Sequence, residues 1–100
     1  MHMLNGMRPI HPGEVLREDF LLPLGLSATA LAAALRVPAS RTLGIVRERR
    51  AISPDTALRI ARYFGGDAKS WLRMQAAFDL RTAEIAARKT IEREVPPRAG

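Results

Sequence analysis

Apolar residues recur along this chain at the three- and four-residue spacing of helices, and no segment alternates apolar and polar residues as a strand does. Proline, glycine and serine separate the periodic stretches. The pattern predicts five helices, at about residues 12–22, 28–35, 38–47, 54–64 and 68–91. Because 100 residues can bury one modest core, we expect a single all-α domain.

Capping residues and helix breakers indicate where these helices begin and end. Ser27, Ser53 and Asp67 each precede a predicted helix. A side-chain oxygen at that position accepts a hydrogen bond from a backbone N–H of the first turn, which stabilises the start of the helix. Pro23 and Gly25 are expected to end the first helix.

The two ends of the chain carry weaker helical signals. Residues 1–7 have no periodic apolar pattern, and we expect them to be a flexible N-terminal segment. Near the other end, Pro96 and Pro97 cannot continue a helix, so residues 92–100 are expected to be a flexible C-terminal tail. Residues 8–91 remain as the folded domain.

Composition makes the predicted core aliphatic. Hydrophobic residues form 47% of the chain but aromatic residues only 5%, so leucine, isoleucine, valine, alanine and methionine must fill the core. Leu58 is assigned to the apolar face of its helix, and Arg17 to the outer face of the first helix. Four large apolar residues of the last helix are interpreted as core or as a dimer interface: Trp71, Met74, Phe78 and Leu80.

Positive charge is concentrated in one segment of the chain. The formal net charge is +6 at pH 7, and residues 36–50 hold five arginines and one glutamate, which amounts to +4 in this segment alone. The segment forms the second half of a predicted helix pair, residues 27–50, whose short turn falls at Arg36 and Val37. A basic helix after a short turn is typical of proteins that read DNA.

The second helix of this pair is expected to enter the major groove while the first helix crosses the DNA backbone. Ala39, Ser40 and Arg41 in its first turn would face base edges. Arg41 is the best candidate to read a guanine, because a guanidinium can bind that base through two hydrogen bonds. Five further residues are expected near phosphates: Ser27, Thr29, Arg47, Arg49 and Arg50. The alternative that these arginines are only solvated stays open on this pattern.

Several other classes of protein find no support in the sequence. The absence of cysteine excludes a disulfide scaffold and a cysteine zinc site, and it suits the reducing cytoplasm. His2 and His11 lack metal-ligand spacing, and no nucleotide-binding, serine-hydrolase or zinc-protease motif occurs. No apolar run reaches the ~18 residues of a membrane span. We therefore expect a cytoplasmic protein that is not an enzyme, with no catalytic residues, no metal and no cofactor.

Three motifs, in chain order, resemble those of the HigA/VapI antitoxins, a family of Xre-type helix-turn-helix proteins. They are HPGE at residues 11–14, TALRIARYFG at residues 56–65, and W-L-x-x-Q-x-x-x-D-L at residues 71–80. The resemblance covers about residues 8–88. It makes residues 8–91 a helix-turn-helix antitoxin domain.

The resemblance implies a five- or six-helix fold of the Xre/lambda-repressor-like class with a C-terminal dimerisation helix. It further implies the antitoxin of a type II HigBA toxin–antitoxin system, which neutralises a HigB toxin, a RelE-like nuclease that cuts mRNA. Such a protein also represses its own operon by binding double-stranded operator DNA as a homodimer. The DNA-facing positions that carry over are Ala39, Ser40, Arg41 and Arg47.

The chain departs from the family pattern inside the helix pair. Arg36 stands at a turn position that glycine usually holds, where a left-handed backbone would strain it. Thr42 replaces an inward isoleucine or valine, Gly44 lies in the middle of a helix, and Arg47 and Glu48 replace a common Asn-Gly. Two alternatives follow: a stand-alone helix-turn-helix regulator without a toxin partner, and a toxin-binding module with weakened DNA binding.

Overall fold

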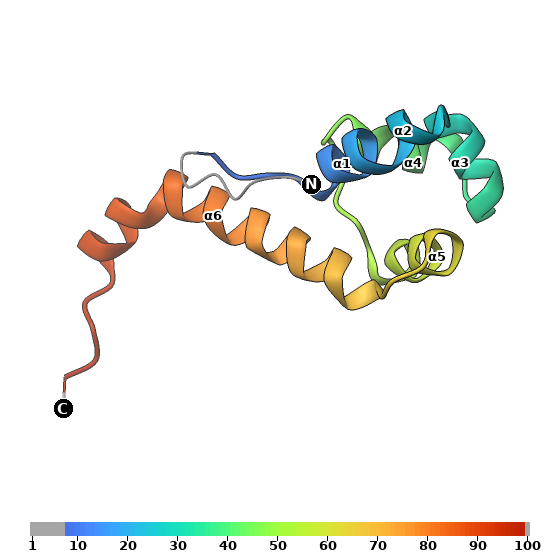
Figure 1. Ribbon diagram of the computed structural model, residues 1–100. Helices are drawn as coiled ribbons and strands as arrows, with labels where there is room; N and C mark the ends of the chain where they lie inside the picture. The colour runs from blue at the N-terminus through green and yellow to red at the C-terminus, as the bar shows by residue number, and fades with distance from the viewer. Residues whose placement is uncertain (1–7, 100) are drawn as a thin grey trace.

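The protein is all-helical across residues 8–99, the part of the chain that the computed structural model describes (Figure 1). The elements are α1 (Pro12–Val15), η1 (Leu16–Leu21), α2 (Leu22–Leu24), α3 (Ala28–Leu35), α4 (Ala39–Val46), α5 (Pro54–Phe64) and α6 (Ala68–Glu94). The first three follow one another without a break and form one helical rod. The predicted all-α fold is confirmed, and residues 8–99 contain no strand.

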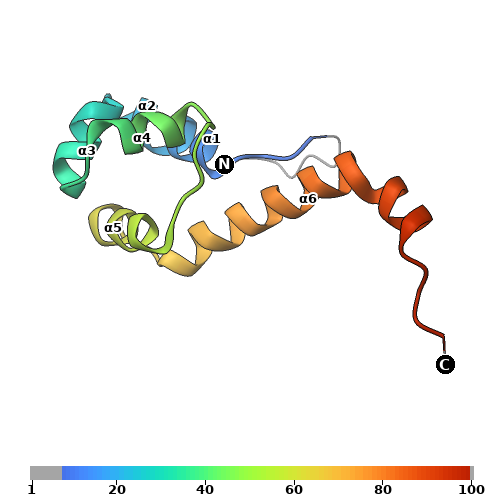
Figure 2. The same ribbon diagram turned by 180° about the vertical axis from the view of Figure 1, so that it is seen from behind.

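The helices form a compact head and a projecting arm. In Figures 1 and 2 the rod, α3 and α4 lie together, α5 lies across from them, and α6 extends away from this head toward the C-terminal end of the chain. The overall dimensions are 53 × 25 × 24 Å. α6 has 27 residues, and its buried residues, Trp71 and Gln75, lie in its first two turns. The outer part of α6 therefore lies outside the core.

Side-chain caps begin three helices where the sequence predicts them. In each case the oxygen accepts from the backbone N–H three residues later, at 3.0 Å for Ser27, 3.2 Å for Ser53 and 2.7 Å for Asp67. These bonds satisfy N–H groups that have no partner inside the helix. α4 begins at Ala39, one residue later than predicted, and α6 continues to Glu94, three residues beyond the predicted end.

The first helix contains a π-helical stretch, η1, that the sequence pattern does not predict. Its hydrogen bonds reach five residues back, as from the N–H of Leu22 to the carbonyl of Arg17. Of the two residues predicted to end the helix, Gly25 is confirmed and Pro23 is wrong, because the helix continues through Pro23 to the left-handed Gly25, with φ 62. Proline lacks an N–H and its ring clashes with the carbonyl four residues back in a regular helix. The π turn directly before Pro23 departs from the regular helix geometry in which this clash arises.

The core is aliphatic, with an aromatic cluster at the base of the arm. Phe20 of η1 packs against Phe64 at the end of α5 and Trp71 of α6, with ring centroids 5.0 and 5.3 Å apart. These contacts join three elements at the point where α6 leaves the head. The largest fully buried aliphatic side chains come from the rod, α3, α4 and α5: Leu16, Leu31, Ile45 and Ile60.

Leu58 lies on the solvent side of α5, so its predicted place on the apolar face is wrong. The side chain is 63% exposed. The buried stripe of α5 consists of Thr56, Ala57 and Ile60. Since each helical residue turns by about 100°, Leu58 points away from the core beside Ala57.

The HPGE motif fixes the rod against α4 and α6. Nδ1 of His11 accepts from the N–H of Gly13 at 2.8 Å and caps α1, and the ring meets Phe78 of α6 edge-on with centroids 4.8 Å apart. Burial lowers the pKa of His11, which keeps the ring neutral and able to accept this bond. A Cβ at position 13 would lie 1.7 Å from the carbonyl oxygen of Ile45, so only glycine fits between α1 and α4.

Candidate nucleic-acid interface

α3 and α4 pack against each other as a helix-turn-helix pair. Backbone bonds close the turn between them, from the N–H of Arg36 to the carbonyl of Ala33 at 3.2 Å and from Val37 to Ala32 at 3.0 Å. Arg36 adopts the left-handed conformation, with φ 60 and ψ 44. This backbone costs a non-glycine residue about 1–2 kcal/mol, so the strain predicted at Arg36 is present.

Thr42 joins α4 to the first turn of α3. The side chain is buried, and its Oγ1 lies 2.7 Å from the carbonyl oxygen of Ala28 and 3.1 Å from that of Ala39. Because the hydroxyl donates to a carbonyl, threonine at this inward position leaves no unsatisfied polar group. The bond to Ala28 ties the first turn of α3 to α4.

Two arginines from neighbouring helices cap the C-terminal ends of the pair. Nη1 of Arg17 in η1 donates to the carbonyl of Val46 at the end of α4. Nη1 of Arg59 in α5 donates to the carbonyl of Leu35 at the end of α3, at 2.9 Å. These carbonyls have no partner within their helices, and a cation there also stabilises the negative end of the helix dipole. Arg17 is 36% exposed and also pairs with Glu18 and Glu48, which agrees with its predicted outer position.

The exposed side of α4 and the segment after it carry the basic residues predicted to meet DNA. Four of the predicted residues are exposed here: Ser40, Arg47, Arg49 and Arg50. Ala39 and Arg41 are half-buried, and Ser27 and Thr29 are exposed at the start of α3. The predicted residues belong to three segments, which are the start of α3, the first turn of α4 and the turn after α4.

Gly44 gives space to the arginines that follow α4. A Cβ at position 44 would lie 3.2 Å from Cβ of Arg50, so the stem of Arg50 crosses α4 where glycine has no side chain. The carbonyl of Gly44 accepts from the N–H of Arg49 at 2.9 Å, and Glu48 in this turn is left-handed with φ 61. Glycine in a helix costs about 1 kcal/mol relative to alanine. Here it allows Arg49 and Arg50 to fold back beside α4.

Arg41 is paired with a carboxylate. Its Nη1 lies 3.1 Å from Oδ2 of Asp55 in the first turn of α5, and its side chain is 28% exposed. The same oxygen accepts from Nε of Arg59 at 2.9 Å. The hydrogen bond from Arg59, with the charges of both arginines, lowers the pKa of the Asp55 carboxyl. Asp55 is therefore an ionised member of this surface that spacing did not reveal, because it lies 14 residues from Arg41.

The four residues predicted at the dimer interface lie in different surroundings. Trp71 is 5% exposed and belongs to the core of the single chain. Met74 and Phe78 are half-buried, Phe78 against His11. Leu80 is 63% exposed on the arm. Of this set, Leu80 offers the largest apolar surface to another molecule.

Residues 8–99 contain no group of three or more histidine, cysteine, aspartate or glutamate side chains placed to hold a metal ion. His11 caps a helix there, and His2 lies outside the described residues. No single helix in this part of the chain is long and apolar enough to cross a membrane. The bent pair Pro12–Leu24 and Ala28–Leu35, with 96° between its helices, meets the requirement on length and composition only.

The helix pair is tied to its neighbours by polar bonds, and exposed arginines follow its second helix. It defines a helix-turn-helix protein of the DNA-binding type. No family model matches the chain. Virulence-associated protein I of Dichelobacter nodosus is 65% identical over 80 residues, which are 80% of this chain and 74% of that protein. The chain belongs to the HigA/VapI family of Xre-type helix-turn-helix antitoxins, as its three motifs predict.

Two solved structures support the same family. The antitoxin HigA of Pseudomonas aeruginosa with the higBA promoter has a TM-score of 0.88 and 48% identity, covering 92% of this chain and 100% of that chain. The antitoxin GraA in complex with its operator has a TM-score of 0.87 and 46% identity, covering 99% and 100%. The likeness includes the head and the projecting α6, because nearly the whole chain is matched.

Proposed function

We propose that this chain is the antitoxin of a type II HigBA toxin–antitoxin system. It binds its operator as a homodimer, represses its own operon and neutralises a HigB toxin, a RelE-like nuclease that cuts mRNA. The observation that carries the proposal is the group of exposed arginines in the turn after α4, on a frame like those of two antitoxins solved with promoter or operator DNA. This function belongs in the cytoplasm and requires no catalytic residue, metal or cofactor.

The surface around α4 offers two kinds of DNA contact. Ala39, Ser40 and Arg41 in its first turn read base edges, with the small Ala39 permitting a close approach. A second set binds phosphates and sets the position of the protein on the duplex: Ser27, Thr29, Arg47, Arg49 and Arg50. Arginine–phosphate contacts release counterions, so the affinity for DNA falls as the salt concentration rises.

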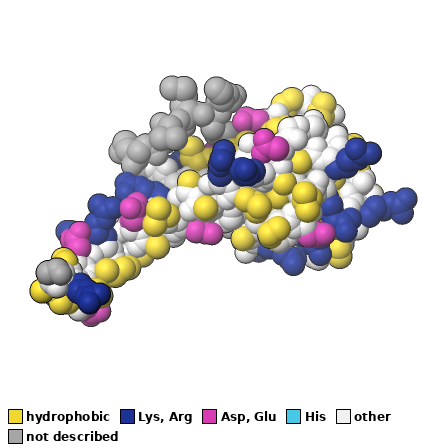
Figure 3. All heavy atoms as spheres, turned by 90° about the horizontal axis from the view of Figure 1, so that it is seen from below, with side chains coloured by type: hydrophobic (Ala, Val, Ile, Leu, Met, Phe, Trp, Pro, Cys, Tyr) yellow, Lys and Arg dark blue, Asp and Glu magenta, His cyan; other side chains and the backbone are white. Residues whose placement is uncertain are grey.

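Exposed apolar positions on α6 support the homodimer. Leu80 and Ile91 are 63% and 53% exposed. Ala83 and Ala87 lie between them at spacings of three and four residues, which places all four on one side of the helix. Figure 3 shows hydrophobic side chains gathered along the projecting α6. A second copy of α6 would cover this stripe, while the core residue Trp71 stabilises the start of the helix within each chain.

A titration of the purified protein with DNA from upstream of its own gene tests the operator half of the proposal. A scrambled fragment is the control, and both are measured at two salt concentrations. We expect tight, sequence-selective binding that weakens at the higher salt concentration. Weak binding that does not depend on the DNA sequence would reject operator recognition. The remaining function would then be that of a toxin-binding module with weakened DNA binding.

Co-expression with the neighbouring toxin gene tests the other half. We expect the two proteins to elute as one complex, and the toxin to lose its mRNA cleavage in a cell-free translation assay. The Arg41→Ala variant is the matched control, because it loses a base contact but keeps the rest of the surface. It should neutralise the toxin as the wild type does. A wild-type protein that binds its operator but leaves the toxin active would be a stand-alone regulator.

A further inference from the structure

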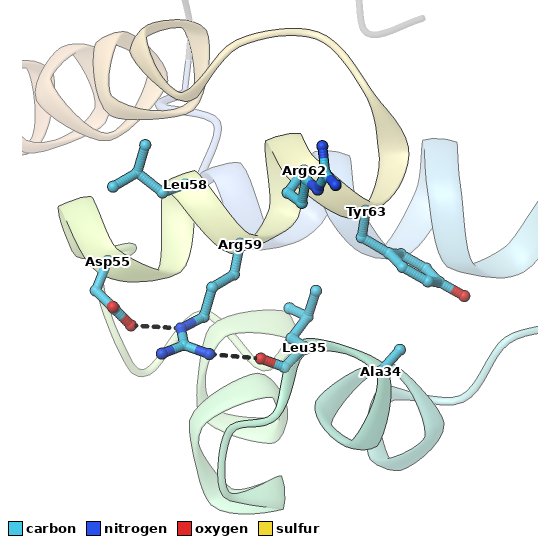
Figure 4. A pocket seen from close by; sticks show the side chains of 7 residues that line it. All are labelled: Ala34, Leu35, Asp55, Leu58, Arg59, Arg62 and Tyr63. Carbon is cyan, nitrogen blue, oxygen red and sulfur yellow. Dashed lines mark hydrogen bonds and ion pairs between the residues drawn. The ribbon is translucent and has the colours of Figure 1, made fainter.

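Arg41 and Asp55 are joined through a carboxylate that is itself held in place. Asp55 lies in the first turn of α5, where its charge is favoured by the helix dipole. Arg59, one turn later, donates from Nε to Oδ2 of Asp55 at 2.9 Å and from Nη1 to the carbonyl of Leu35 at 2.9 Å. Figure 4 shows the Arg59 guanidinium between these two acceptors, with both bonds dashed. The position of the Asp55 carboxylate is thus anchored to the end of α3.

The contact with Asp55 leaves one edge of the Arg41 guanidinium available. Among the contacts of residues 8–99, this guanidinium uses Nη1 alone, at 3.1 Å from Oδ2. Nε and Nη2 form the opposite edge, and two parallel N–H groups match O6 and N7 of guanine. An arginine whose Nη1 is held by a carboxylate, and whose Nε and Nη2 make no hydrogen bond within residues 8–99, is oriented before it meets the base.

We propose that Asp55 is a specificity-determining positioning residue, which holds Arg41 so that its Nε and Nη2 edge reads a guanine in the operator. The proposal rests on the operator binding proposed above. Asp55 acts in two ways. It orders Arg41 in advance, so less conformational freedom is lost on binding the correct base. Asp55 also occupies Nη1 of Arg41, which would otherwise bind backbone phosphates regardless of the DNA sequence. The negative charge of Asp55 repels those phosphates as well.

The ionisation of Asp55 is consistent with this role. Its carboxyl pKa is lowered by the hydrogen bond from Arg59 and by the charges of Arg59 and Arg41. The carboxylate is therefore charged throughout the neutral pH range in which DNA binding is measured.

The test compares operator and scrambled DNA as ligands for Asp55→Ala in the full chain. We expect weaker binding to the operator and tighter binding to the scrambled fragment, so that the ratio of the two affinities falls about tenfold or more. Glu92→Gln is the matched control, because it removes one negative charge from an exposed position near the end of α6. It should tighten binding to both fragments alike. Asp55→Asn, which keeps the shape of the side chain, repeats the test if Asp55→Ala melts early.

The double variant Arg41→Ala with Asp55→Ala separates positioning from a structural or purely electrostatic role. If Asp55 acts through Arg41, removing Asp55 changes the specificity ratio no further once Arg41 is gone. Single G·C replacements in the operator give a second readout. One of them should weaken wild-type binding strongly but weaken binding of Asp55→Ala only slightly.

Three results would overturn the proposal in distinguishable ways. A selective wild type whose specificity ratio is unchanged in Asp55→Ala rejects the positioning role and keeps operator recognition. An equal loss of specificity with and without Arg41 assigns the effect of Asp55 to the fold or to net charge. A wild type that does not distinguish the operator from scrambled DNA rejects operator recognition, and the role of Asp55 falls with it.

Discussion

At the scale of single residues, the unusual positions of the helix-turn-helix pair differ in how well their surroundings compensate them. The hydroxyl of Thr42 donates to a carbonyl, and Gly44 makes space for Arg50. Arg36 is left-handed and exposed, and nothing in the structure explains an arginine there. The cost of its backbone is therefore uncompensated, and removing it should stabilise the protein.

We expect Arg36→Gly to raise the free energy of unfolding by about 1 kcal/mol, because glycine adopts positive φ without the clash of a Cβ. Chemical denaturation monitored by circular dichroism measures the change. Arg36→Ala is the control, since it removes the same charge but keeps the Cβ, and it should give no comparable gain. A lower or unchanged midpoint for Arg36→Gly would show that the turn is not strained.

Features of the candidate site that follow from the local sequence were predicted, whereas contacts between residues far apart in the sequence were missed. The basic segment and the N-cap at Ser27 can be predicted from adjacent residues in the sequence. Asp55 meets Arg41 across 14 residues, and Arg17 meets Val46 across 29. Such contacts exist only once the helices have packed, so helical spacing places an arginine on a face but does not name its partner.

At the scale of elements, the helices and their order follow from caps and periodicity, whereas their irregularities do not. The sequence pattern does not predict the π-helical η1 or the continuation of the helix through Pro23. Both depend on backbone hydrogen bonds, which the spacing of apolar residues does not specify. Leu58 was misassigned because apolar residues cover a wider side of α5 than the stripe that is buried. The junction of α1 with α6, through His11 and Phe78, likewise needed the fold.

This junction makes stability depend on pH. Burial lowers the pKa of His11, against the opposing charges of Glu48 and Asp79. The unfolded chain thus binds the proton more readily than the folded protein, and the free energy of unfolding rises with pH in this range. The contribution of His11 is complete above a pH of about 6.5 and is lost as the pH falls below it.

We expect the melting temperature of the wild type to fall between about pH 7 and about pH 5 by more than that of His11→Asn. Asparagine can still cap α1 but does not titrate. The lowered pKa values of Asp55 and Asp67 contribute a loss only below about 3.8, outside this interval. If the melting temperatures of the two proteins fall equally with pH, His11 is not the source of the pH dependence.

At the scale of the whole molecule, α6 divides the protein into a head that carries the candidate DNA surface and an arm with exposed apolar side chains. The arm was predicted as a helix, but its separation from the head was not, because Trp71, Met74 and Phe78 were grouped with Leu80 by spacing alone. Burial ends within the first turns of α6. The outer part is therefore where a second copy is expected to bind.

We expect Leu80→Asp to weaken the homodimer by at least about tenfold, because a charge would be buried in an apolar contact. Sedimentation equilibrium over a range of protein concentrations measures the dissociation constant. Leu24→Asp is the matched control, since Leu24 on α2 is also 63% exposed. A monomeric wild type would show that no homodimer forms. An equal effect of both substitutions would place the dimer contact away from Leu80.

We expect codon 13 to tolerate as few amino-acid substitutions as the codon of a catalytic residue does, although Gly13 has only a structural role. Any side chain there would overlap the carbonyl of Ile45, and backbone cannot yield as the end of a flexible side chain does. Adding a single methyl group would push α1 away from α4. Among random mutations at this codon, only synonymous changes therefore preserve the packing of α1 on α4.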